Sequence, residues 1–136
     1  MSRSQRISAL AATSVATFAM IALPTSPVYA ASACVQTNTY KTNPNHPPYT
    51  ARIAYCDNVA PTTVYSGATF AEPAGKLTTS RSWFMCFNDH GEYHGRGPHP
   101  TRWLYTKADT PANTWGYVPD FRIYSETDTV ATRCFS

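Results

Sequence analysis

Four cysteines constrain this chain more than any other feature of its sequence. They are Cys34, Cys56, Cys86 and Cys134, and all of them lie beyond residue 30. No two are spaced as Cys-x-x-Cys, the arrangement typical of zinc ribbons and redox-active sites. An even number of well-separated cysteines in a short segment is typical of a small domain from an oxidising compartment that two disulfides hold together.

The connectivity of the disulfides is open at this point, because four cysteines allow three pairings. We predict Cys34–Cys56, which ties down residues 31–61, and Cys86–Cys134, which fastens the C-terminal tail to a central hairpin. Pairing Cys56 with Cys86 and Cys34 with Cys134 would also join the terminus to the core. Each disulfide would stabilise so small a domain by about 2–4 kcal/mol.

Residues 1–30 have the layout of a secretory signal peptide. Arg3 and Arg6 precede an apolar stretch without acidic residues at 7–24, too short and too interrupted by Ser and Thr to span a membrane well. Small side chains flank position 29, so we expect cleavage after Ala30, with sites one or three residues further along as alternatives. The mature protein is therefore expected to be secreted, and extracellular or associated with the cell wall.

The charge argues against one class of partner. The chain has a formal net charge of +3, but Arg3 and Arg6 belong to the predicted signal peptide. Without them the net charge falls to about +1, which lacks the excess of Lys and Arg that drives nucleic-acid binding. No second apolar segment of membrane length follows. We therefore expect no nucleic-acid partner and no membrane span in the mature chain.

The sequence after residue 30 predicts a mostly β fold. No stretch keeps an apolar 3.6-residue period for more than one turn, and short runs of β-branched and aromatic residues alternate with segments rich in Gly and Pro. The expected strands are 52–56, 62–65, 81–87, 102–106, 114–118 and 121–124. Residues 31–61 contain only one of them, so we interpret this range as an N-terminal extension and 62–136 as the main domain.

The order of segments from residue 62 onward carries a family resemblance. The segments, in order, are Val64-Tyr65-Ser66-Gly67, Ala74-Gly75-Lys76-Leu77, Trp83-Phe84-Met85-Cys86-Phe87, Trp103-Leu104-Tyr105-Thr106, and Gly116-Tyr117-Val118 with Phe121 to Ile123. They look like an opening strand with its turn, the strand before the second turn, the two strands of a central hairpin, and a closing Gly-aromatic-Val signature. The chain thus resembles a bacterial SH3-like (SH3b) domain, of the small secreted type found in actinobacteria.

The resemblance implies a fold and a function. The fold would be a small SH3-like barrel of five to six strands with the disulfide-tied extension at its N-terminus, and Gly116 would lie where strands cross closely at a corner. The function would be recognition without catalysis, most simply of peptide or glycan in the bacterial cell wall. No cofactor is expected.

Aromatic residues divide into expected core and expected ligand site. Large aromatics dominate burial in a domain of this size, which assigns Trp83, Trp103, Tyr117 and Phe121 to the core. Other rings alternate out of phase with the core or lie in loops, and they are candidates for a groove that stacks on sugars or packs on peptide. These candidate ligand-binding residues are Tyr65, Phe70, Tyr93, Tyr105 and Trp115.

One polar loop could bind a metal. His90, His94 and His99 lie close together in sequence with two carboxylates, a composition that suits zinc, copper or nickel. The same loop contains three glycines and a proline, so we expect it to be flexible and its histidines to have no common face. A metal site is therefore a minor alternative to a solvated loop.

Other functions find less support. The cysteines are expected to be paired and no serine lies in a Gly-x-Ser-x-Gly elbow, while the acids are scattered, with Asp89 and Asp120 as one conceivable pair. We therefore expect no enzyme. The alternatives are a secreted proteinaceous inhibitor or toxin, and a small cell-wall hydrolase or metal-binding protein. Binding to peptidoglycan, to an extracellular protein such as a protease, or turnover of a wall substrate would distinguish them.

Overall fold

The computed structural model describes residues 30–45, 48–130 and 132–134, so the predicted signal peptide at 1–29 lies outside the described residues. The described part is mostly β and contains no α-helix, in agreement with the sequence. Its elements are β1 (Val35–Asn43), β2 (Tyr49–Asp57), β3 (Thr62–Tyr65), β4 (Pro73–Leu77), β5 (Arg81–Phe84), β6 (Cys86–Asn88), β7 (Trp103–Lys107), β8 (Trp115–Pro119) and the short 3-10 helix η1 (Asp120–Arg122). Within these residues no helix is long and apolar enough to cross a membrane.

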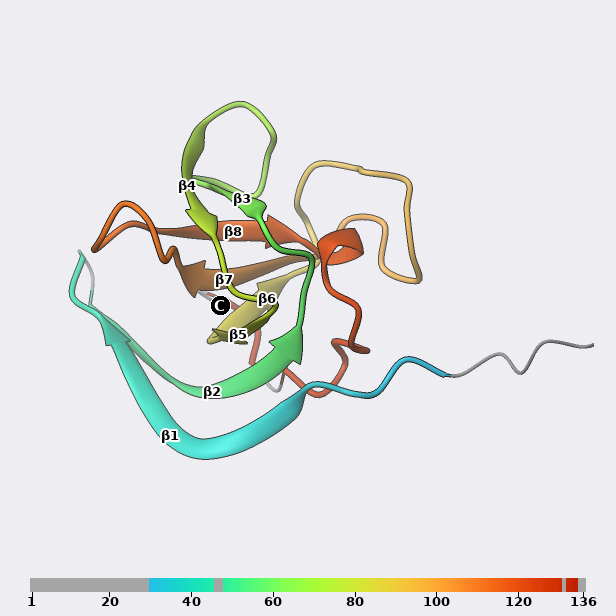
Figure 1. Ribbon diagram of the computed structural model, residues 1–136, viewed down its shortest axis with the longest axis horizontal. Coiled ribbons are helices and arrows are strands. Elements are labelled where there is room, and N and C mark those ends of the chain that lie inside the picture. Colours follow the sequence, from blue (N-terminus) through green and yellow to red (C-terminus); the bar gives the residue numbers. More distant parts are fainter. Residues whose placement is uncertain (1–29, 46–47, 131, 135–136) are drawn as a thin grey trace, which may run out of the picture.

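The strands form two antiparallel sheets instead of the expected closed barrel. One sheet has the order β1-β2-β5 and the other β4-β3-β8-β7-β6, and Figure 1 shows β1 and β2 curving beneath the larger sheet. The chain passes from the first sheet to the second at Met85, whose N–H donates to the carbonyl of Tyr105 on β7. The end strands β1 and β4 do not pair with each other, so the described strands stay open.

Most expected strands are confirmed, with three differences. Residues 81–87 form two strands, because Met85 interrupts the ladder between β5 and β6. The strand expected at 121–124 is wrong: η1 occupies its first half, and only Ile123 makes a single bridge, to Asn58. Strand β1 was missed because its side chains are mostly exposed and polar, and its pairing with β2 defines it.

The main core lies between the two sheets. Val64, Phe84, Leu104 and Val118 are fully buried there. Residues from the predicted N-terminal extension complete the same core, namely Cys34, Ala54 and Cys56. A second buried cluster lies where β2, β7 and the 85–86 segment meet, and it consists of Ala51, Ile53, Met85, Cys86 and Tyr105.

Both predicted disulfides are confirmed. Cys34 bonds to Cys56 and Cys86 to Cys134, with Cα–Cα distances of 4.5 and 5.0 Å. The second fastens the C-terminal tail to β6, where the N–H of Cys134 also donates to the carbonyl of Phe87. Two disulfides that use every cysteine are typical of a protein from an oxidising, extracellular environment.

Candidate functional site

The structure separates the five predicted ligand-binding residues into three places. Tyr65 and Phe70 are in contact, with ring centroids 5.4 Å apart. Tyr105 and Trp115 stack on each other elsewhere, at 6.0 Å. Tyr93 lies alone in the 89–102 loop and is 71% exposed. The first pair lines a concave surface.

That surface is a groove next to β3 and the end of β8. Tyr65, Phe70 and Phe121 supply three aromatic rings to its lining, and its volume is about 260 Å³. The remaining lining residues are Thr62, Thr63, Pro119 and Arg122. We call this the aromatic groove. It combines flat apolar faces with a guanidinium group and polar threonines, the mixture that ligand sites commonly use.

Trp103 packs against two of the rings that line the aromatic groove. Its side chain is fully buried, and its ring meets Tyr65 at 5.7 Å and Phe70 at 4.8 Å between centroids, both edge to face. The indole Nε1–H donates to the backbone carbonyl of Glu92, 3.0 Å away. A Cβ added to Gly91 would lie 2.0 Å from the indole ring, so only glycine fits against Trp103 at that position.

Glu92 connects the 89–102 loop to the loop that carries Phe70. Its backbone N–H donates to the carbonyl of Ala68, and its carboxylate accepts a 2.8 Å hydrogen bond from the backbone N–H of Phe70. The position of Phe70 in the aromatic groove is therefore set by a residue more than twenty positions further along the chain. The sequence had indicated Glu92 only as one of the two carboxylates of the possible metal-binding loop.

The close approach of β3 and β8 sets one wall of the groove. Tyr65 pairs with Tyr117 across these strands, and a Cβ on Gly116 would lie 2.1 Å from the carbonyl oxygen of Tyr65. This agrees with the expectation that Gly116 lies where strands cross closely. Any side chain there would push β3, and Tyr65 with it, away from β8.

Phe121, which the sequence assigns to the core, contacts one arginine and shares the lining of the aromatic groove with another. The ring is half-buried, and the guanidinium of Arg96 lies 5.2 Å from its centroid. Arg122 donates from Nε to the hydroxyl of Thr62 at 2.8 Å and from Nη2 to the carbonyl of Pro61. In the sequence, an aromatic residue directly followed by an arginine is the signal for this part of the groove. The same residues also fit the strand that the sequence predicts at 121–124.

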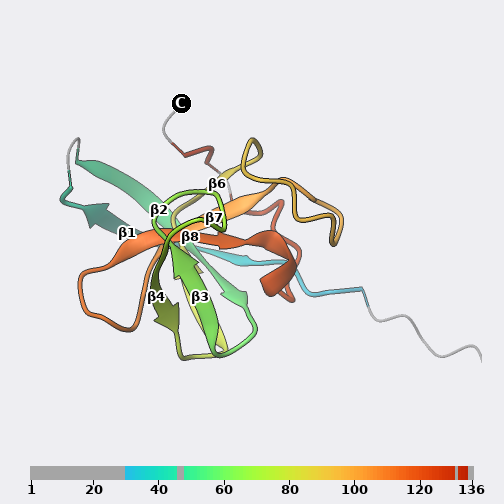
Figure 2. The ribbon, with the colours of Figure 1, turned by 90° about the horizontal axis from the view of Figure 1, so that it is seen from above.

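A second hollow shares Phe121 with the aromatic groove. Its volume is about 310 Å³, and Arg96, Asp120 and Glu126 contribute polar groups to its lining. Burial raises the pKa of Asp120, against a hydrogen bond from Thr127 that lowers it. The hydrogen bond from His99 lowers the pKa of Glu126. Figures 1 and 2 both place η1 and the 89–102 loop on the same side of the molecule.

The other aromatic pair belongs to a packed cluster. Tyr105 is 7% exposed, and its hydroxyl is 2.5 Å from Nδ2 of Asn43, which donates to it. Trp115, half-buried, contacts Trp83 at 5.7 Å, and Tyr117 contacts Tyr105 at 4.8 Å.

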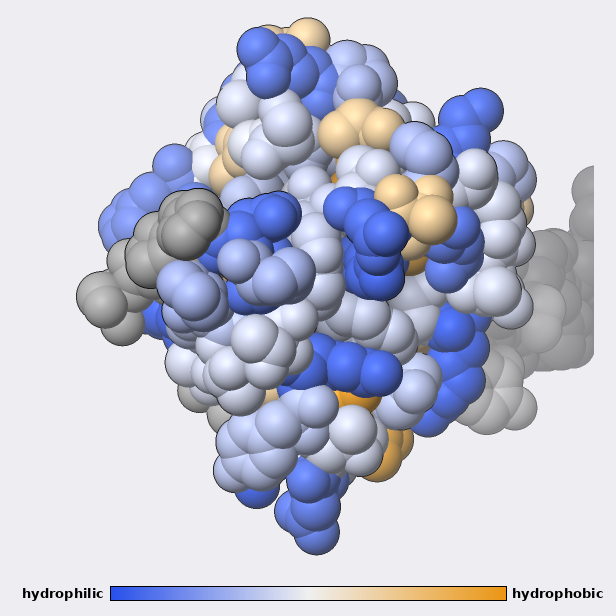
Figure 3. All heavy atoms as spheres, turned by 90° about the vertical axis from the view of Figure 1, so that its left-hand side faces the viewer, coloured by the Kyte–Doolittle hydropathy of each residue, from blue (hydrophilic) through white to orange (hydrophobic). Residues whose placement is uncertain are grey.

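Figure 3, viewed from the side of the β7–β8 loop, shows a largely hydrophilic or neutral face with small separate apolar patches. Of the four rings expected in the core, Trp103 is fully buried and Trp83, Tyr117 and Phe121 are partly buried.

The three histidines of the 89–102 loop do not share a site. His90 is exposed, and His94 packs against Phe121 at 5.1 Å with its Nε2 3.2 Å from the carbonyl of Arg102. His99 instead pairs with Glu126. Within the loop, the backbone N–H of Gly91 donates to the carbonyl of Thr101, and that of His94 donates to the carbonyl of Pro100.

The two acids named as a conceivable catalytic pair have separate partners. Asp89 forms an ion pair with Arg102 at 2.7 Å, whereas Asp120 accepts a hydrogen bond from Thr127 at 2.5 Å. The two ion pairs of Arg102, to Asp89 and Asp128, raise its pKa, outweighing the lowering effect of burial. Asp89 therefore serves to hold a buried guanidinium.

Comparison of the chain with models of protein families, with curated proteins and with solved structures found no significant match.

Proposed function

We propose that this protein is an exported, non-catalytic binding module of the SH3-like type, and that the aromatic groove binds peptide or glycan of the bacterial cell wall. The observation that carries the proposal is the lining of the groove, in which three aromatic rings converge beside an arginine. Sugars stack on such rings through their C–H faces, and peptide side chains pack on them. The guanidinium donates hydrogen bonds to hydroxyl, carbonyl or carboxylate groups of a ligand.

The size of the aromatic groove limits what it holds. At about 260 Å³ it is smaller than most sites for drug-sized ligands, which start near ~300 Å³. One sugar ring or one to two amino-acid side chains fit this space. A repetitive polymer suits such a site, because many weak contacts along one strand add up through multivalency.

The strand order supports the SH3-like part of the proposal. Each segment on which the resemblance rests, up to Val118, overlaps a strand: β3, β4, the bent β5–β6 pair, β7 and β8 in turn. The 81–88 segment belongs to both sheets, as a strongly bent strand shared between two small sheets does. The proposal therefore concerns a binding scaffold with loops and exposed rings at one side.

Sedimentation with purified peptidoglycan tests the proposal. Phe70→Leu removes a flat ring from the groove but keeps an apolar side chain, and we expect it to weaken binding about 5- to 30-fold, the equivalent of about 1–2 kcal/mol. Tyr40→Ala is the matched control, since Tyr40 is an exposed aromatic on β1, outside the groove. Circular dichroism of both variants verifies that they are folded.

Three results would contradict the proposal. Equal binding by the native protein and the Phe70→Leu variant would remove the groove as the site. Release of soluble wall fragments during the assay would indicate a hydrolase. A stable complex with an extracellular protease, without sedimentation, would favour the inhibitor alternative.

A further inference from the structure

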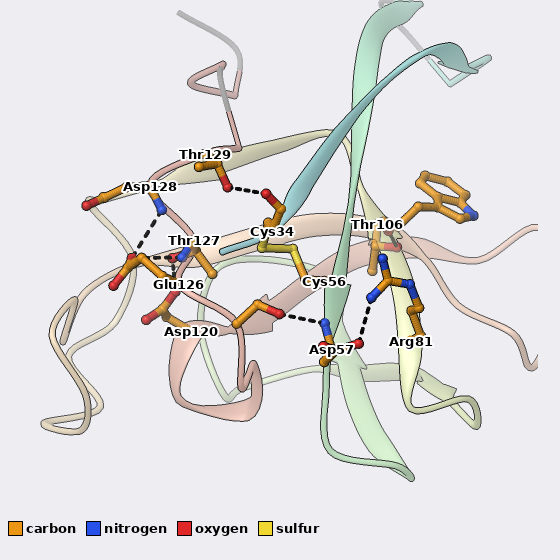
Figure 4. Close-up of a disulfide and its surroundings, with 12 residues drawn as sticks. Cys34, Cys56, Asp57, Arg81, Thr106, Asp120, Glu126, Thr127, Asp128 and Thr129 are labelled. Atoms are coloured by element: carbon orange, nitrogen blue, oxygen red, sulfur yellow. Dashed lines mark hydrogen bonds and ion pairs between the residues drawn. A yellow bond between two sulfur atoms is a disulfide. The ribbon is translucent and has the colours of Figure 1, made fainter. Parts of the chain in front are cut away.

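Half of the acidic residues of the chain gather around one buried arginine. The whole sequence has eight Asp and Glu residues. Asp89 and Asp128 each form an ion pair with Arg102, while Asp120 is bound to Thr127 and Glu126 to His99. Thr127 also contacts Arg102 at 3.2 Å. Figure 4 shows Asp120, Glu126, Thr127 and Asp128 together on one side of the Cys34–Cys56 disulfide.

Three side chains of this group place atoms that could coordinate a metal ion, here called ligand donor atoms, close to one another. Nε2 of His99 lies 2.8 Å from Oε1 of Glu126 and 3.4 Å from Oδ1 of Asp128. All three donor atoms lie within 4.8 Å of one another. Zinc binds His nitrogen and carboxylate oxygen at about 2.0–2.2 Å, so neighbouring ligand atoms in a tetrahedral or octahedral shell are about 3.0–3.5 Å apart. The two distances from His99 lie close to that spacing.

A surrounding network already holds the donor atoms in place. Oε1 of Glu126 accepts the backbone N–H groups of Thr127 at 2.7 Å and of Asp128 at 3.1 Å. Nη1 of Arg102 donates to Asp128 at 2.8 Å, and its Nε donates to Asp89. Ligand carboxylates in metal sites are themselves hydrogen-bonded in this way, which fixes their orientation before the ion arrives.

The negative charge of the cluster also favours the binding of a cation. Arg102 forms ion pairs with Asp89 and Asp128, whereas Glu126 forms no ion pair with an arginine or lysine among the described residues. Its partner His99 is neutral when it acts as a ligand. His99 is largely buried, with 19% of its side chain exposed, whereas that of Asp128 is 64% exposed. The site therefore has an inner imidazole and an outer carboxylate, which leaves a route by which an ion enters.

We infer that His99, Glu126 and Asp128 form a binding site for a divalent first-row metal ion, with zinc as the best match. One imidazole and two carboxylates suit zinc, nickel or copper, while magnesium and calcium prefer oxygen ligands alone. This differs from the site considered from the sequence, which combined His99 with His90 and His94. The carboxylate ligands come instead from the C-terminal tail.

The bound ion would cross-link two segments that are distant in sequence. His99 belongs to the 89–102 loop, and Glu126 and Asp128 belong to the tail that follows η1. The tail also contacts the N-terminal segment, through a bridge of Ala33 with Glu126 and a hydrogen bond from Thr129 to the carbonyl of Cys34. A metal here would thus stabilise the fold.

Zinc titration of the chelator-treated, purified secreted protein by isothermal calorimetry tests the inference. We expect one zinc ion per chain, a higher melting temperature with zinc, and much weaker binding of magnesium. His99→Ala and Glu126→Gln should each weaken zinc binding at least 10-fold. Glu126→Gln keeps the size of the side chain and one oxygen that can accept the backbone N–H groups of Thr127 and Asp128. It therefore distinguishes lost coordination from lost folding.

His90→Ala is the matched control, because His90 is an exposed histidine of the same loop outside the cluster. Its zinc affinity should equal that of the native protein. Unchanged zinc binding in Glu126→Gln or His99→Ala would overturn the inference. Equal weakening by His90→Ala would also overturn it, because the ion would then be held by the loop histidines. These results are independent of peptidoglycan sedimentation.

Discussion

At the scale of single residues, Gly91 and Gly116 decide how closely other groups approach. A Cβ at Gly91 would overlap the Trp103 ring, and one at Gly116 would overlap the carbonyl oxygen of Tyr65. The first contact lets the 89–102 loop lie on Trp103, and the second lets β3 lie against β8. Both are required for Tyr65 and Phe70 to face the same groove.

Tyrosines of the packed aromatic cluster should make the stability depend on alkaline pH. Burial, together with nearby Tyr105 and Tyr49, raises the pKa of Tyr117 to about 12, whereas an unfolded tyrosine titrates near ~10. The unfolded chain therefore loses its proton first as the pH rises. The stabilisation is present below pH ~10 and is lost between pH ~10 and ~12, by up to about 2–3 kcal/mol.

Urea unfolding followed by tryptophan fluorescence at several alkaline pH values measures this loss. Tyr117→Phe should flatten the decline of the unfolding free energy with pH. Tyr124→Phe, at a position that is 63% exposed, should follow the native curve. An equally steep decline in Tyr117→Phe and the native protein would show that the aromatic cluster does not cause the pH dependence.

At the scale of elements, the 89–102 loop functions as a brace for the aromatic groove. Glu92 accepts the N–H of Phe70 and the indole N–H of Trp103, the first on its side chain and the second on its backbone. The first contact joins two loops that are far apart in sequence, and the second joins the 89–102 loop to the first residue of β7. A loop that the composition suggests is flexible thus positions the rings of the candidate site.

Glu92→Ala should loosen the loop that carries Phe70. Without the carboxylate, the Phe70 N–H loses an acceptor worth about 1 kcal/mol, and its hydrogen exchange should accelerate about 5- to 10-fold. The matched control is Glu72→Ala, because Glu72 lies in the same loop and accepts a hydrogen bond from the hydroxyl of Ser66. If Phe70 exchanged equally fast in both variants, the brace would have no special role.

At the scale of the whole molecule, residues 31–61 are built into the fold. β2 pairs with β5, and Cys34, Ala54 and Cys56 share the main core with residues of the larger sheet. The two disulfides span 22 and 48 positions and fasten opposite ends of the chain. Disulfides therefore tie the two ends of the described part to β2 and β6.

Removing the Cys34–Cys56 disulfide should destabilise the whole domain. We expect the double variant Cys34→Ala with Cys56→Ala to lose about 3 kcal/mol of unfolding free energy, mainly because the unfolded chain gains conformational freedom. Urea unfolding of the variant and of the native protein measures the difference. An unchanged unfolding midpoint would show that the sheet pairing of β2 alone holds the extension.

The sequence could predict features that depend on neighbouring residues. Period-two runs of β-branched and aromatic residues predicted β2, β3, β7 and β8, because the side-chain alternation of a strand is local. It could not predict β1, whose strand conformation depends on its partner β2. The strand expected at 121–124 failed for a different reason: the N–H of Ile123 donates back to the carbonyl of Asp120, and this local hydrogen bond closes a 3-10 turn.

Cysteine number and composition were enough to predict a disulfide-bonded, mostly β domain, since these constraints act on any compact arrangement of the chain. Only the tertiary structure decided which of these residues come together in one place. Sheet order brings Tyr65 and Phe70 to Phe121 but leaves Tyr105 and Trp115 in a packed cluster. The path of the tail likewise brings Glu126 and Asp128 to His99. Contacts between residues this far apart along the chain depend on how strands pair and bend, which no local pattern encodes.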